Sequence, residues 1–133
     1  MKQELKDRIT KVAESLEFSV YFSERYNEEN SFDIEFSGYT DMGQNILFHA
    51  VMKDDDPDTL VKDLYDGWQA YDPDEEASLW IGPDGHGKNG APYRISDIVK
   101  DMEDAESQYE KLYEEMRKEF KDYPEDETDE EDE

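Results

Sequence analysis

Residues 31–37, Ser31-Phe32-Asp33-Ile34-Glu35-Phe36-Ser37, decide the fold class of this chain, because polar and apolar residues alternate there without interruption. Such alternation puts the apolar side chains on one face of an extended segment and the polar side chains on the other. The pattern therefore predicts a β-strand that is buried on one face. Its outward face carries two acids, Asp33 and Glu35.

A second strand is expected on the N-terminal side of this one. Phe18, Val20 and Phe22 alternate there with Ser19, Tyr21 and Ser23. The polar run 26–30 separates the two segments and predicts a turn.

A third strand, residues 45–52, follows a glycine-containing turn. One of its faces would hold Ile46, Phe48, Ala50 and Met52, and the other Leu47, His49 and Val51. Because both faces are largely apolar, we expect this strand to be central in the sheet or covered on two sides. In that setting His49 is expected to be packed rather than catalytic.

Helical periodicity surrounds the strands. Apolar residues three or four apart predict an N-terminal helix that ends near Leu16. Asp56-Pro57 begins the next helix, because Asp can cap free backbone amides and Pro fits the first helical position. The predicted buried stripe of that helix is Leu60, Val61, Leu64, Tyr65 and Trp68.

Asp72-Pro73 repeats this start signal and predicts a short helix over 73–80, although Ser78 to Ile81 also fits a strand. Ser96 is expected to cap the last helix, which should end near Lys121. The predicted buried stripe of the last helix is Ile98, Met102, Ala105, Tyr109, Leu112 and Met116, joined by Val99, Tyr113 and Phe120.

The order of these elements predicts an α+β fold. An N-terminal helix precedes a three-stranded antiparallel sheet, and two or three further helices pack on that sheet. We expect residues 1–121 to form a single domain and residues 122–133 to be a disordered acidic tail, because the periodic apolar residues give way to a run of acids.

The composition is dominated by negative charge. The chain has 39 Asp and Glu against 14 Lys and Arg, which gives a net charge of −25 over 133 residues. Residues 122–133 hold nine acids and no base, so residues 1–121 carry −16. Such an excess repels itself. Two interpretations stay open: the acidic surface binds a basic partner, or it only keeps the protein in solution.

The sequence also argues against several classes of protein. The first 16 residues mix charges and lack an apolar run, so we expect no signal peptide, no membrane-spanning helix and a cytoplasmic location. Cysteine is absent, which excludes disulfides and thiolate metal sites. An anionic membrane surface would repel the chain.

An enzyme is not expected, and neither is a metal or cofactor. The Asp-rich run 54–58 lacks the Gly and Glu that a calcium loop needs at its sixth and twelfth positions. In the glycine-rich loop 82–92, Gly87-Lys88 is followed by Asn89 rather than the Ser or Thr of a phosphate-binding loop. This loop is interpreted as a tight irregular turn, with contact to a partner as the alternative.

Small size, no cysteine, many aromatic residues and extreme negative charge together resemble the anti-defence proteins of phages and mobile elements, among them anti-CRISPR inhibitors and antirestriction DNA mimics. The segment Trp80-Ile81…Gly87-Lys88-Asn89-Gly90-Ala91-Pro92 is also similar to small proteins of mobile elements. The resemblance implies a stoichiometric inhibitor that blocks DNA binding by a CRISPR or restriction nuclease in a bacterial host. It would bind no nucleic acid itself and would act as a monomer or homodimer.

Acids held on ordered backbone are the expected partner-binding residues, because rigid side chains lose less entropy on binding than mobile ones. These residues are Asp33, Glu35, Asp54, Asp55, Asp56, Asp58, Asp74, Glu75, Glu76, Glu103, Asp104, Glu106, Glu110, Glu114 and Glu115. The alternatives are an acidic chaperone-like or regulatory protein that binds a basic partner, and a binding module that uses loop 82–92.

Overall fold

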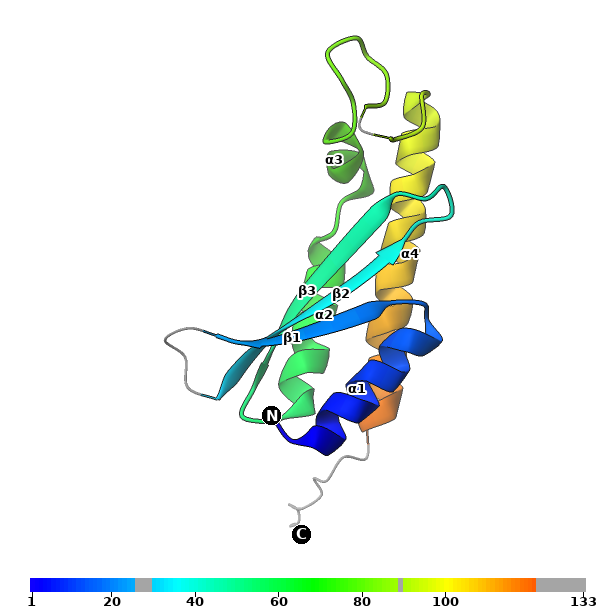
Figure 1. Cartoon of the computed structure of the whole chain (residues 1–133). Helices are drawn as coiled ribbons and strands as arrows, with labels where there is room; N and C mark the ends of the chain where they lie inside the picture. The colour runs from blue at the N-terminus through cyan, green and yellow to red at the C-terminus, as the bar shows by residue number, and fades with distance from the viewer. Residues whose placement is uncertain (26–29, 89, 122–133) are drawn as a thin grey trace.

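A three-stranded antiparallel sheet lies at the centre of the computed structural model, which describes residues 1–25, 30–88 and 90–121 (Figure 1). The strands are β1 (Ser19–Glu24), β2 (Ser31–Tyr39) and β3 (Asn45–Lys53), in the order β1-β2-β3. Phe36 of β2 is paired with Val20 of β1 and with Phe48 of β3. The predicted α+β fold is confirmed, and the predicted tail, 122–133, lies outside the described residues.

Three of the four helices in the described residues cover one face of this sheet, and none of the four covers the other face (Figure 1). They are α1 (Gln3–Ser15), α2 (Pro57–Ala70) and α4 (Ile95–Phe120). The short helix α3 (Pro73–Ser78) packs on the N-terminal half of α4, beyond the end of the sheet. None of the helices in the described part of the chain has an apolar run long enough to cross a bilayer.

The main core lies between the sheet and these helices, where the predicted apolar faces meet. Ile34, Phe36 and Phe48 are buried under the sheet, and the ring of Tyr109 on α4 stacks on Phe48 with ring centres 3.9 Å apart. The main residues of the predicted α4 stripe are also buried: Ile98, Met102, Ala105, Tyr109, Leu112 and Met116. Periodicity therefore identified the core-facing side of both the central strand and the longest helix.

A second, smaller core joins α3 and the loop after it to the start of α4. Ala77, Ile98 and Met102 are buried there, with Trp80 and Ile81 packed against them. The predicted Asp caps of α2 and α3 are both confirmed, since the Asp56 and Asp72 side chains accept hydrogen bonds from backbone amides of the first turn. The alternative strand at 78–81 does not form, apart from an isolated bridge between Ile81 and Gly87.

Four expectations are wrong. The central strand is β2, not residues 45–52, because two successive short connections place β3 at the edge of the sheet. Leu47 is consequently 56% exposed, and His49 is exposed rather than packed. Ser96 does not cap α4, which begins at Ile95 after Arg94. Tyr65 on α2 is exposed, because the buried stripe of that helix centres on Leu60 and Leu64.

Candidate acidic interaction surface

Four glutamates follow one flank of α4, beside its buried stripe. The first of them is exposed and the other three are half-buried. Glu103, Glu106, Glu110 and Glu114 are three or four residues apart, the spacing that aligns side chains on a helix. We call them the α4 acid row. It extends over about 16 Å, at 1.5 Å per residue. None of the four forms an ion pair with a Lys or Arg in the described ranges 1–25, 30–88 and 90–121.

The acids of α3 lie close to the N-terminal half of this row. Tyr71, in the link between α2 and α3, is the point where they meet. Burial raises the pKa of Tyr71 well above its ordinary value, and the carboxylates of Glu76, Glu106 and Asp101 raise it further. Glu76 and Glu106 therefore act on the same ring, although they are 30 residues apart. Packing therefore brings one predicted acid of α3, Glu76, near one predicted acid of α4, Glu106.

Two predicted acids on α4 are engaged within the molecule. The Asp104 carboxylate accepts hydrogen bonds from the Asp41 amide and the Gln108 side chain, both at 3.0 Å. Glu115 pairs with Lys118 at 3.2 Å. These two carboxylates are less available to a partner than the α4 acid row.

The two acids of β2 lie on the uncovered face of the sheet, as predicted, but their charge is partly balanced. Asp33 pairs with Arg25 at 2.7 Å and lies 3.4 Å from the His49 ring nitrogen. Glu35 is the register partner of both Tyr21 and His49. No sequence pattern predicted the ion pair between Arg25 and Asp33, because it forms only when β1 and β2 align.

The Asp-rich segment 54–58 lies at the turn between β3 and α2, at the opposite end of the sheet from α3 (Figure 1). Asp54 and Asp55 have left-handed backbone conformations, with φ of 58° and 53°. Asp56 serves as the cap of α2 and accepts from the Asp58 amide at 3.1 Å. No group of three or more acidic or His side chains in the described residues is placed to hold a metal ion.

The described residues of loop 82–92, which are 82–88 and 90–92, are held by backbone hydrogen bonds. Hydrogen bonds run from Gly82 N–H to the His86 carbonyl at 2.7 Å and from Lys88 N–H to the Trp80 carbonyl at 2.9 Å. The His86 ring stacks on Tyr93 with ring centres 4.0 Å apart. A side chain on Gly87 would collide with the Pro92 carbonyl, so glycine is required there. These contacts fit a tight turn that packs on α4.

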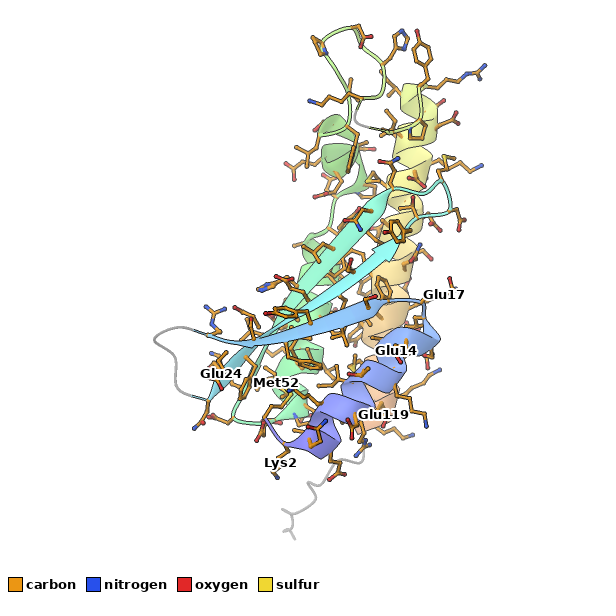
Figure 2. All side chains as sticks on the ribbon, in the orientation of Figure 1. Lys2, Glu14, Glu17, Glu24, Met52 and Glu119 are labelled. Atoms are coloured by element: carbon orange, nitrogen blue, oxygen red, sulfur yellow. The ribbon has the colours of Figure 1, made fainter. Side chains whose placement is uncertain are left out.

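Sequence reasoning missed an acidic groove of about 650 Å³ on the other flank of α4. It lies where α1 ends and β2 ends, and its charged lining residues are Glu17, Asp41, Asp104 and Lys111. Figure 2 shows Glu17 at the turn between α1 and β1. The left-handed φ of 67° at Glu17 turns the chain there. No sequence pattern connects these residues, because they come from three separate parts of the chain.

The predicted acids therefore form several separated sets. Among the described residues, the α4 acid row is a set of four on one helix with no ion pair to Lys or Arg, and Glu76 of α3 lies near it. Comparisons with protein-family models, curated proteins and solved structures find no match to this chain.

Proposed function

We propose that this protein is a stoichiometric inhibitor whose acidic surface occupies the basic nucleic-acid-binding cleft of another protein. A CRISPR nuclease of a bacterial host is the partner that the resemblance to anti-defence proteins favours, because its DNA channel is lined with Arg and Lys. The observation that carries the proposal is the α4 acid row, four carboxylates on one helix with no ion pair in the described residues.

The spacing of the row indicates what it can imitate. One carboxylate every ~4.5–6 Å is sparser than the phosphates of duplex DNA, which place about one charge per 1.7 Å of axis, or about 3.4 Å for one strand. The charge density of the row is therefore closer to that of a single strand than to that of a duplex. Glu76 of α3 lies near the row at Glu106, and Asp74 and Glu75 add charge on the same short helix.

The test compares two variants with the same change in net charge. In one, the four glutamates of the row become Gln. In the matched control, Glu130, Glu131, Asp132 and Glu133 become Gln, Gln, Asn and Gln. Each protein is added to a panel of CRISPR effector complexes before DNA, and both DNA binding and cleavage are measured. We expect the row variant to inhibit about tenfold or more weakly than the wild type, because several desolvated charge pairs are removed. A tenfold loss of affinity corresponds to about 1.4 kcal/mol of binding free energy. The tail variant should stay close to the wild type.

Several outcomes would contradict the proposal. Inhibited cleavage with intact DNA binding would exclude the mimic mechanism. A tail variant that loses all inhibition while the row variant keeps it would move the site off the folded surface. Equal, salt-sensitive binding to any basic protein would favour the chaperone-like alternative. The protein should not shift free DNA in a mobility assay.

A further inference from the structure

Side chains satisfy the backbone groups along only half of the outer edge of β3. In an antiparallel strand, alternate residues direct both backbone polar groups to the same side. On the closed half, Val51 N–H donates to the Asp63 carboxylate at 2.7 Å and Lys53 N–H donates to the Thr59 hydroxyl at 2.8 Å. Side chains of α2 thus replace the missing neighbouring strand at these two positions.

The other half of the same edge carries no such cover. Leu47 and His49 share the alternation of Val51, so their N–H and C=O groups also point away from β2. No described residue accepts a hydrogen bond from either N–H. Leu47 is 56% exposed, and the His49 side chain is 48% exposed. Unpaired edge groups of this kind are a template for another strand.

A small groove of about 90 Å³ runs beside this open half. Its lining includes Leu47 and Phe48 of β3, together with Tyr71, Glu76 and Trp80 from the segment around α3. The aromatic rings offer an apolar wall for one side chain. The Glu76 carboxylate gives the groove a negative charge, which suits a basic neighbour.

We propose that the Leu47–His49 edge of β3 is a strand-addition site for an extended segment of a partner protein in which apolar and basic residues alternate. Backbone hydrogen bonds to the open edge would supply affinity, and alternate side chains would give selectivity. An apolar side chain would face the groove, against Tyr71 and Trp80, and the alternate basic side chains would lie on the uncovered face of the sheet, which carries Asp33 and Glu35. A second copy of this chain is a poor occupant, because two molecules of charge −25 repel each other. This proposal is independent of the function proposed above.

The first test uses synthetic peptides on the full-length protein. The probe is a capped Lys-Val-Lys-Val-Lys peptide, and its binding is measured by amide NMR and hydrogen exchange of the protein. We expect the Leu47 and His49 amides to shift and to exchange more slowly as the peptide binds. Two matched controls should fail to bind. One is the same peptide N-methylated on the residues that pair with the edge, and the other is Glu-Val-Glu-Val-Glu.

The second test removes the donor from the protein. Leu47→Pro deletes one edge N–H at a position where Pro is tolerated, whereas Leu47→Ala trims the side chain and keeps the N–H. We expect Leu47→Pro to weaken peptide binding about fivefold to tenfold, the loss expected for about one backbone hydrogen bond. Leu47→Ala should weaken it less. Thermal melting of each variant establishes that the fold is retained.

The proposal is overturned if the N-methylated peptide binds wild-type protein as well as the unmodified one, a result that does not depend on any variant folding. It is also overturned if the peptide shifts only the amides of the α4 acid row. Concentration-dependent dimerisation that protects the Leu47 amide would assign the edge to a second copy instead. Binding at the edge and inhibition of a nuclease can each fail without the other, because the peptide assay contains no nuclease.

Discussion

Asp101 is a fully buried carboxylate, and it fixes the turn between β2 and β3 to α4. The Thr40 hydroxyl donates to one of its oxygens at 2.6 Å, and the Met42 amide donates to the other at 3.3 Å. Both partners lie about 60 residues earlier in the chain. A buried acid is tolerated here because each of its oxygens has a donor.

We expect Asp101→Ala to lower the free energy of unfolding by about 1–3 kcal/mol, because buried donors of the turn lose their acceptor. Asp101→Asn keeps one carbonyl oxygen and should cost less. Urea unfolding of the two variants provides the measurement. An Ala variant as stable as the wild type would mean that water replaces the carboxylate without loss.

Tyr109 provides a second test at the residue scale. Burial first, and then the Asp63 carboxylate, raise the pKa of its hydroxyl to about 12. In the unfolded chain the hydroxyl should ionise near its ordinary pKa of 10. Between these values the unfolded state releases a proton that the folded state keeps.

The stabilisation is therefore fully present below pH 10 and is lost as the pH rises towards 12. We expect it to amount to about 3 kcal/mol, since the folded and unfolded pKa values differ by about two units and one unit corresponds to about 1.36 kcal/mol. Urea unfolding from pH 9 to 12 should show a steeper loss for the wild type than for Tyr109→Phe. Identical pH profiles would contradict the assignment. The pKa of Tyr71 is raised in the same direction, so some slope should remain in the Phe variant.

At the scale of elements, Gly67 of α2 lies directly against Tyr109 of α4. A side chain added at this position would collide with the hydroxyl of Tyr109 and approach its ring carbon at 2.9 Å. Glycine in the middle of α2 is therefore explained by packing, although alanine would favour the helix by about 1 kcal/mol.

We expect Gly67→Ala to lower the free energy of unfolding by about 1–3 kcal/mol, because overpacking outweighs the helix preference. In the Tyr109→Phe background the loss should be smaller, since the hydroxyl is gone. A double-mutant cycle measures this coupling. Gln69→Ala, on an exposed position of α2, is the control and should change stability little. Additive effects of Gly67→Ala and Tyr109→Phe would refute the contact.

For the whole molecule, self-repulsion of negative charge is the dominant long-range term. The ordered ion pairs use several of the few cations. Arg8, for example, pairs with Glu119 at 2.6 Å and so links α1 to the foot of α4, where Figure 2 labels Glu119. The remaining acids repel one another, and added salt shortens the distance over which this repulsion acts. The screening length is about 10 Å at 0.1 M salt and about 3 Å at 1 M.

We expect deletion of residues 122–133 to leave the melting temperature unchanged or slightly raised, because it removes nine negative charges and no residue of the core that residues 1–121 form. Raising salt from about 0.1 M to 1 M should raise the melting temperature of the full chain more than that of the truncated chain. Thermal scans of both proteins at both salt concentrations provide the comparison. A drop of many degrees on truncation would mean that the acidic segment packs on the domain.

The sequence by itself determined the classes of element and the faces they bury. Alternation over 31–37 and the helical repeat over 95–120 are local properties, because a side chain's direction follows from the backbone period alone. The Asp-Pro caps of α2 and α3 were predictable for the same reason, since a cap depends on two or three adjacent residues. The α+β class followed from the order of these elements.

Only the tertiary structure decided which strand is central and which acids are free. The exposure of His49 depends on β3 being at the edge of the sheet. The charge of Asp33 is partly balanced because Arg25, directly after β1, lies beside it. The α4 acid row was visible as a spacing, but the pairing of Glu115 and the engagement of Asp104 were not. These properties depend on residues far apart in the sequence, and no local period encodes which of them meet once the core has packed.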